Sequence, residues 1–206
     1  NGLYHITMYL SLNGGGNEKD DLRIHATSYT EKEDGSVELT AFTNKSKAKE
    51  LKLDTVDGKA VTSIARHPFR WDFLVETVYI GKDVKELRGE SFVNLRALKE
   101  FVVDEQNESF CAVDGVLYTK DMKTLLCCPK AYEGKEFTVP ASVEVISRSA
   151  FSDCKLEEIY LPEGLKTIET LAFLKATELK EIYSYEGDKL YKSLPEGLEF
   201  IGLGDE

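Results

Sequence analysis

The chain has 206 residues, of which 42% are apolar and 31% are charged, a composition ordinary for a globular protein or for a repeat domain with a small cap. Its 37 acidic and 26 basic residues give a net charge of −11 without any cluster of lysine and arginine, so nucleic acid and anionic membrane surfaces are poor partners. A membrane-spanning helix needs about 18 consecutive apolar residues, and we expect no membrane span in this chain because no such run occurs.

Residues 1–60 lack the repeat that follows them, and their pattern predicts a small β-type cap at the N-terminal end of a solenoid. Two β-type runs, 22–30 and 37–43, flank a turn at Asp34-Gly35. The run 50–56 adds a third predicted strand.

A repeat begins at Val61, and we expect residues 61–206 to form the solenoid. In each unit an apolar residue is followed by another three positions later and by Phe eight positions later. The four sets are Val61, Ile64, Phe69; Val84, Leu87, Phe92; Val143, Ile146, Phe151; and Leu165, Ile168, Phe173. Units of 23 residues (Val61 to Val84) and 22 residues (Val143 to Leu165) lie within the range of leucine-rich repeats.

An alternating apolar pair follows each of the first three sets and predicts a core strand. In residues 156–161, Ile159 and Leu161 are expected to face inward while Glu158 and Tyr160 face outward. The apolar residues that open each unit form the opposite wall, and the Phe fills the space between the walls. Because one coil cannot bury both walls alone, the coils stack in parallel, about 4.8 Å apart.

The interval from Val84 to Val143 is 59 residues, far longer than one unit. It includes residues 110–129, which read as a β-meander: FCAV, a turn at Asp114-Gly115, VLYT, a polar turn and TLLCCP. The sequence therefore predicts hairpins inserted at about 105–135 in an otherwise continuous solenoid.

The segments VEVISRSAFSDCKLEEIYLPEG and LKTIETLAFLKATELKEIYSYEG resemble the BspA-type leucine-rich repeats of bacterial surface proteins. The marks of the resemblance are Ala150-Phe151, Ala172-Phe173, Cys154 in the bend and the Ile-x-Leu-Pro at residues 159–162. The resemblance covers roughly residues 36–201, and the first coil departs from it because His67-Pro68 precedes its Phe. It implies a β-rich leucine-rich-repeat solenoid in a bacterial cell-surface or secreted protein, often lipid-anchored, and carries over no catalytic residue.

The residue types that catalysis or metal binding needs are few and dispersed. His5, His25 and His67 are the only histidines, and no zinc-type spacing, HExxH or Cys-x-x-Cys pair occurs. A cysteine nucleophile needs a histidine and an electropositive pocket, so we interpret Cys154 as a buried bend residue. We therefore expect no enzyme activity, no cofactor and no metal site.

Two further residue patterns have structural interpretations. The four cysteines are too irregularly spaced for a disulfide scaffold, and the adjacent Cys127 and Cys128 should point to opposite faces of a strand. Two glycosylation sequons, at Asn44 and Asn107, are about the number expected by chance.

Two outward rows of side chains on the predicted sheet form the candidate binding surface. The first row is Tyr79, Val102, Thr138, Tyr160 and Tyr183, and the second is Thr77, Glu100, Glu136, Glu158 and Glu181. Like charges on neighbouring strands destabilise a sheet, and exposed tyrosine is typical of binding surfaces. The alternative is a solvated face on which Lys99, Lys135 and Lys180 neutralise the acids.

The sequence thus favours a non-enzymatic adhesion or binding module. It would engage a protein or glycan at the cell surface through the concave face of the solenoid. The alternative is an architectural spacer or assembly module of a cell-surface complex. The chain begins at Asn1 and not at Met, so we expect either a processed protein or a chain without its natural start; a removed N-terminal segment would have carried any secretion signal or lipid anchor.

Overall fold

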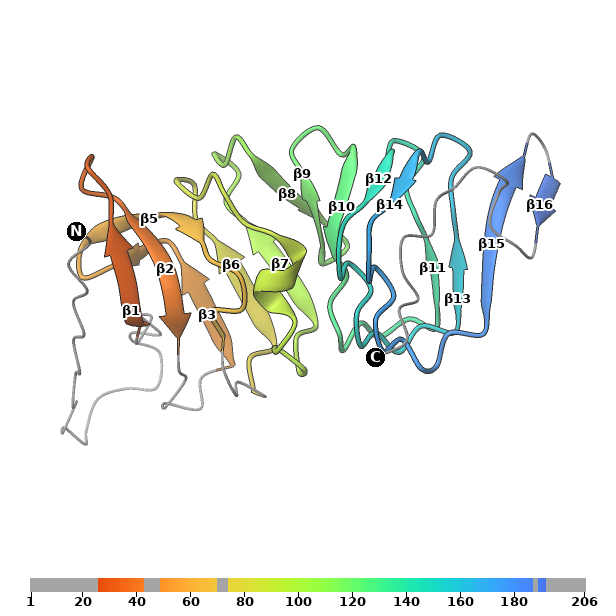
Figure 1. The fold of residues 1–206 in the computed structure, drawn as a ribbon, viewed down its shortest axis with the longest axis horizontal. Coiled ribbons are helices and arrows are strands. Elements are labelled where there is room, and N and C mark those ends of the chain that lie inside the picture. Colours follow the sequence, from red (N-terminus) through yellow and green to blue (C-terminus); the bar gives the residue numbers. More distant parts are fainter. Residues whose placement is uncertain (1–25, 43–48, 70–73, 187–188, 192–206) are drawn as a thin grey trace.

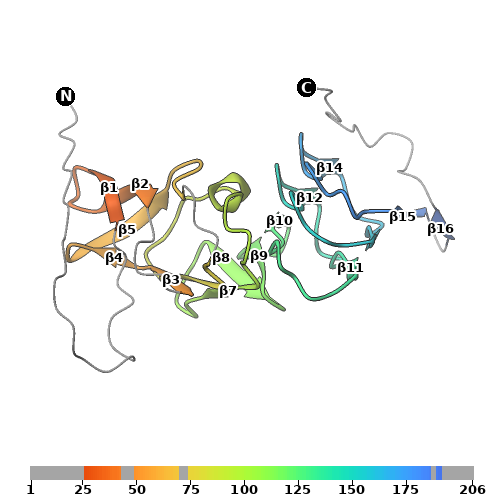
Figure 2. The same cartoon turned by 90° about the horizontal axis from the view of Figure 1, so that it is seen from below.

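The computed structural model describes residues 26–42, 49–69, 74–186 and 189–191. These residues form an elongated stack of coils, with β1 near one end and β16 at the other (Figure 1). Strands lie along two opposite sides of the stack and enclose the core between them (Figure 2). The predicted solenoid of parallel stacked coils is confirmed. Within the described residues, no helix has the length and apolar character that a membrane crossing requires.

One long side, here called the strand face, consists of two separate sheets. The first contains β3 (Glu50–Leu53), β6 (Thr77–Ile80) and β7 (Glu100–Val103), and the second contains β11 (Glu136–Thr138), β13 (Glu158–Tyr160), β15 (Glu181–Glu186) and β16 (Lys189–Tyr191). Apart from the antiparallel β16, neighbouring strands pair in parallel, with Val78 opposite Phe101 and Ile159 opposite Ile182. The alternation of buried and outward side chains holds this register, because a one-residue slip would turn the apolar set to solvent.

The other long side, here called the opposite wall, carries shorter extended segments. It contains β5 (Lys59–Ile64), β10 (Thr124–Cys127), β12 (Val145–Ile146) and β14 (Thr167–Ile168). The last three pair in parallel, with Leu125, Ile146 and Ile168 in line. All three side chains are buried, so the wall is held to the strand face by a common apolar core.

The N-terminal hairpin pairs β1 (Ala26–Glu31) with β2 (Val37–Phe42) around a turn in which Gly35 has a φ of 81°. β4 (Thr55–Val56) pairs antiparallel with β5. Parallel pairing already links β2 to β5 and β3 to β6, so coil-like stacking begins before the expected boundary at residue 60. The division into a cap over 1–60 and a solenoid over 61–206 stays a prediction, and residues 1–25 lie outside the described part.

The phenylalanines of the repeat occupy the core as predicted. Phe69, Phe92 and Phe151 are fully buried, and Phe173 is 8% exposed. Phe69 stacks on Phe92 with 5.8 Å between ring centroids, and Phe151 stacks on Phe173 at 5.4 Å. Each ring therefore packs against its equivalent in the next coil.

The turn before the phenylalanine is also repeated, including in the divergent first coil. His67, Ser149 and Leu171 each lie two residues before their Phe and have φ angles of 53°, 59° and 62°. Non-glycine residues rarely adopt this left-handed conformation, so its recurrence reflects a constraint of the coil. His67 is exposed and takes part in this turn.

The predicted meander is present as β8 (Phe110–Val113), β9 (Val116–Thr119) and β10, paired antiparallel. Its strands separate two apolar clusters. Leu117, Leu126 and Cys127 pack in the N-terminal cluster, whereas Val116, Tyr118, Leu125 and Cys128 pack in the C-terminal cluster. We call β9 and β10 the septum. Strands buried on both faces have near-continuous apolar sequences, which explains VLYT and TLLCC.

The last strand of the meander is also part of the solenoid itself. β10 pairs in parallel with β12, so it occupies the position of a wall segment and is not confined to an insert. Its continuation is coil-like as well, because the Cys128 N–H donates to the Ala150 carbonyl just as the Phe151 N–H donates to that of Ala172. The hairpins expected at about 105–135 thus contain one complete wall segment.

The stacked rings generate the first prediction. Replacing Phe151 or Phe173 with Ala should lower the free energy of unfolding by about 3–5 kcal/mol, because each change leaves a cavity in the stack. Leu174, 40% exposed on the same turn, is the matched control, and Leu174→Ala should cost far less. Urea denaturation measures the three differences. Losses below about 1 kcal/mol at both phenylalanines would contradict the core assignment.

A second prediction concerns the junction beside the septum. Gly89 begins the short 3-10 helix η1 (Gly89–Phe92), and a Cβ on it would lie 2.2 Å from the Leu126 carbonyl oxygen and 2.9 Å from that of Arg148. Gly89→Ala must therefore move backbone and should destabilise the protein by about 1–3 kcal/mol. At the control position, Gly164, the nearest atom is 3.7 Å away, so Gly164→Ala should cost nothing. Equal melting temperatures for the two variants would contradict the close approach.

Candidate functional site

The tyrosine row is continuous on the second sheet of the strand face. Thr138, Tyr160 and Tyr183 lie opposite one another on β11, β13 and β15, in the register predicted from the sequence. The rings of Tyr160 and Tyr183 stack with 4.8 Å between centroids and an interplanar angle of 11°. Both side chains are half-exposed, so the stacked pair presents an aromatic surface to solvent.

Each stacked tyrosine is hydrogen-bonded to the acidic row on its own strand. The Tyr160 hydroxyl donates to Glu158 Oε2 (2.7 Å), and the Tyr183 hydroxyl donates to Glu181. These bonds to carboxylates raise the pKa of Tyr160 and of Tyr183 to about 12, so both phenols stay protonated at neutral pH. The two rows therefore form one hydrogen-bonded surface.

The acidic row is also in register, because Glu136, Glu158 and Glu181 lie opposite one another on adjacent strands. We call Glu136, Glu158, Glu181, Tyr160 and Tyr183 the tyrosine–glutamate face. Three carboxylates thus follow one another along the stack with about 4.8 Å between strands.

The lysines expected to neutralise this row pair with a different one. Lys135 and Lys180 both bind Glu157, with 3.1 Å between Lys135 Nζ and the carboxylate, and Lys135 also binds Glu178. On the first sheet Glu76 binds Lys49 (2.7 Å) and Lys99 (2.9 Å). These contacts lower the pKa of Glu76 and of Glu157. The ion pairs of these lysines therefore alternate along a neighbouring row.

Tyr79 and Glu100 are not brought to this face. They lie on β6 and β7 in the first sheet, which the meander separates from the second. The Tyr79 hydroxyl donates to Asp104 Oδ2 at 2.5 Å, which raises its pKa to about 12, and Glu100 accepts from Thr77 Oγ1 at 3.1 Å. The sequence alignment of the strands was right within each sheet, but it does not make one ladder of five.

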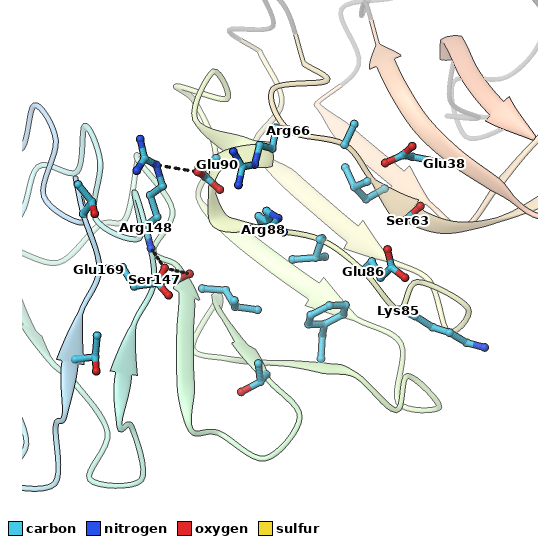
Figure 3. A pocket seen from close by; sticks show the side chains of 18 residues that line it. Glu38, Ser63, Arg66, Lys85, Glu86, Arg88, Glu90, Ser147, Arg148 and Glu169 are labelled. Carbon is cyan, nitrogen blue, oxygen red and sulfur yellow. Dashed lines mark hydrogen bonds and ion pairs between the residues drawn. The ribbon is translucent and has the colours of Figure 1, made fainter. Parts of the chain in front are cut away.

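A hollow lies on the opposite wall and not on the strand face, where we expected the concave surface. It has a volume of about 1130 Å³ and opens where the two halves of the molecule meet, between β5 and β12 (Figure 3). Its apolar lining comprises Ile64, Leu87, Phe110 and Leu126, with Ala65 beside them. We call it the junction groove.

Arginine is concentrated in this groove. The sequence analysis, which followed the repeat, did not predict this cluster. Of the four arginines in the described ranges, Arg66, Arg88 and Arg148 line it, and Arg96 does not. Arg148 Nε binds the buried Glu90 at 2.9 Å across the junction (Figure 3). The sequence signal was available, since arginines are rare in an acidic chain and two of these lie one coil apart.

The remaining sequence candidates have structural roles or lie outside the described residues. Cys154 is buried, and its Sγ lies 3.6 Å from the Cys128 carbonyl oxygen; all four cysteines are unpaired thiols. Asn107 is 1% exposed, and it donates to the carbonyls of Gly81 and Val84 while accepting from two backbone N–H groups. The asparagine of this sequon is therefore buried. His5, His25 and Asn44 lie outside the described ranges.

Known proteins of similar structure are bacterial leucine-rich repeat proteins. The pneumococcal vaccine antigen PcpA is 26% identical over 73% of this chain and 40% of its own, with a TM-score of 0.50. A leucine-rich cell surface protein from Faecalibacterium prausnitzii A2-165 is 25% identical over 64% of this chain and 41% of its own, with a TM-score of 0.52. The chain thus spans about two fifths of each. Among curated proteins, none matches it.

A family model described as a BspA-type leucine-rich repeat region matches six copies over residues 30–112 and 130–193. The unmatched residues 113–129 contain β9 and β10, which are the septum. The match begins within the expected cap, in agreement with the parallel pairing of β2 and β3. By its repeats, their stacking and this match, the chain belongs to the BspA-type leucine-rich repeat family.

Proposed function

We propose that this chain is a non-enzymatic binding module at the bacterial cell surface or in the secreted fraction. It binds a protein that carries lysine or arginine, through the tyrosine–glutamate face. The surface location is supported by the family and by the printed descriptions of the two similar structures, a vaccine antigen and a cell surface protein.

The observation that carries the proposal is the uniform charge of one row beside three that alternate. Lysine, glutamate and lysine follow one another at Lys49–Glu76–Lys99, at Lys135–Glu157–Lys180 and, on the opposite wall, at Lys123–Glu144–Lys166. The row of Glu136, Glu158 and Glu181 breaks this rule, although like charges on adjacent strands are unfavourable. Binding a cationic partner would remove that repulsion.

The stacked tyrosines add the contact area that a row of carboxylates lacks. An arginine or lysine placed over the ring of Tyr160 or Tyr183 would gain cation–π attraction and reach a carboxylate at the same time. Tyrosine is also among the residues that contribute most at protein interfaces. The chemistry therefore favours a basic protein surface over a neutral glycan.

The third prediction tests this face after a partner has been recovered by pull-down from extracellular extracts. Tyr160→Ser together with Tyr183→Ser should weaken its binding by a factor between about thirty and about a thousand, because aromatic anchors buried in an interface contribute about 2 kcal/mol each and neighbouring contributions need not add. The melting temperature should change little, since both rings lie outside the core. Biolayer interferometry measures the affinities.

Charge reversal supplies the matched comparison. Glu136→Lys, Glu158→Lys and Glu181→Lys together should slow association and remove its salt dependence. The control triple, Glu33→Lys, Glu105→Lys and Glu163→Lys, changes the net charge equally at exposed turns elsewhere and should bind like the wild type. Equal binding by all variants would exclude this face. If the chain instead binds neutral glycans on an array, and this binding is lost in the tyrosine variant but kept in the glutamate variant, the partner would be a glycan and not a protein.

A further inference from the structure

The opposite wall is interrupted at the junction groove. On one side, β5 is extended by a parallel bridge between Ser63 and Glu86. On the other side, β10, β12 and β14 pair in parallel. Residues 85–87 thus end one run of wall segments, and the groove lies where the next segment would pair.

At this interruption, backbone carbonyl groups lack the hydrogen-bond donors that a following wall segment would supply. The Thr62 carbonyl accepts from the N–H groups of Lys85 and Glu86, and the Lys123 carbonyl accepts in the same way from Glu144 and Val145. By this equivalence the Lys85 carbonyl should accept from a following segment. Within the described ranges no group donates to it.

The carbonyl of Leu87 is in the same position. Its equivalents, the carbonyls of Leu125 and Ile146, accept from the N–H groups of Ser147 and Glu169 at 2.9 Å. Leu87 receives no such bond from any described residue. Residues 85–87 therefore present an unpaired strand edge to the groove, and such edges pair readily with an added strand.

A buried hydroxyl also lacks a partner in this groove. Ser63 is 2% exposed and lines the groove, yet its Oγ finds no hydrogen-bond partner among the described residues (Figure 3). Buried polar groups are nearly always hydrogen-bonded, so an unpaired one calls for an explanation. A ligand in the groove would supply it.

The charged side chains at this edge indicate which charges a strand that pairs with residues 85–87 should carry. On the intact wall, Lys123 binds Glu144 at 3.1 Å. Glu169, which follows the paired Ile168, accepts from the Ser147 hydroxyl at 3.4 Å and from the backbone N–H of Arg148 at 2.8 Å. At the groove, the positions of Lys123 and Ser147 are occupied by Lys85 and Arg88, for which the described part of the chain supplies no ion pair. An acidic residue opposite each would restore the pattern of the wall.

We propose that the junction groove binds an extended acidic segment of a partner protein, of pattern Glu-x-apolar-Glu. It pairs with residues 85–87 in parallel, in the manner of the absent wall segment. Its first acid meets Lys85, its apolar residue packs near Leu87 and Leu126, and its second acid meets Arg88, with Arg66 nearby (Figure 3). This site does not depend on the tyrosine–glutamate face.

Other charges of the groove limit what can bind. Glu90 is occupied by Arg148, and Glu169 accepts from the backbone of Arg148. Glu38 and Glu86 lie on the side of the groove toward β5 (Figure 3). They disfavour an acid at the x position, which would neighbour Glu86, so a neutral or basic residue belongs there.

The fourth prediction uses a defined probe, the labelled peptide Leu-Glu-Thr-Ile-Glu-Thr-Leu. It is the wall segment 165–171 with its lysine replaced by glutamate, and both ends are blocked so that only side chains supply carboxylates. Fluorescence anisotropy should show saturable binding to the whole chain. Replacing either peptide glutamate by glutamine should weaken binding about tenfold, as for hydrogen bonds to charged groups.

Variants of the protein locate the binding. Arg88→Gln and Lys85→Gln should each weaken it about tenfold, and each should be non-additive with loss of the peptide acid it meets. Arg96→Gln, outside the groove, should have no effect. Ser63→Ala should weaken peptide binding without lowering the melting temperature, whereas a purely structural serine would give the opposite result.

Two results would overturn the proposal. One is the absence of binding up to about 1 mM peptide, a concentration at which even weak specific contacts are detectable. The other is binding that Arg88→Gln and Lys85→Gln leave unchanged, which would place the peptide elsewhere, such as on the edge of β14. The variant with Tyr160→Ser and Tyr183→Ser should bind the peptide normally, so failure here and failure of the tyrosine–glutamate face are distinguishable.

Discussion

The architecture of this protein depends on the burial of both faces of the septum. In an ordinary solenoid each strand has one inward face, and the outward face meets water. β9 and β10 instead alternate between two apolar clusters, with Leu117 and Leu126 on one side and Tyr118 and Leu125 on the other. The core of each half is therefore completed by the same two strands. This shared partition also explains why the strand face is split into two sheets and why the opposite wall opens into a groove beside it.

Electrostatics supports the stacking in a second, weaker way. A parallel stack places equivalent positions of successive coils side by side, so charged side chains of the same sign at these positions would repel one another. Alternation of lysine and glutamate avoids this at three rows, where a single glutamate such as Glu157 lies between two lysines. Each pair is exposed and contributes little by itself. The departure from alternation at Glu136, Glu158 and Glu181 is therefore informative because it forgoes an arrangement that the chain uses elsewhere.

Much of this could be predicted from the sequence, and the exceptions have physical causes. The recurring Phe and the period-two strands predicted the core and the local register, because buried positions of a strand are apolar and therefore alternate with polar ones in the sequence. The dual role of β10 was hidden because Cys127-Cys128 occupies the position that Ala150-Phe151 occupies in the next coil. The separation of Tyr79 from Tyr160 could not be predicted, since aligned positions do not reveal where hydrogen bonding between strands stops. Two of the four hydrogen bonds of Asn107, those to the carbonyls of Gly81 and Val84, join residues more than 20 positions apart, beyond the reach of a local motif.

Two adjacent cysteines, the last residue of the septum and the residue that follows it, report on different parts of the molecule. Cys127 packs in the N-terminal cluster and Cys128 in the C-terminal cluster, and burial raises the pKa of both thiols. A thiol reacts as its thiolate, so each is protected until its own cluster opens. The rate at which a thiol reagent modifies each cysteine therefore measures local opening on one side of the partition. Two residues that are neighbours in the sequence can thus report separately on the two halves that the septum divides.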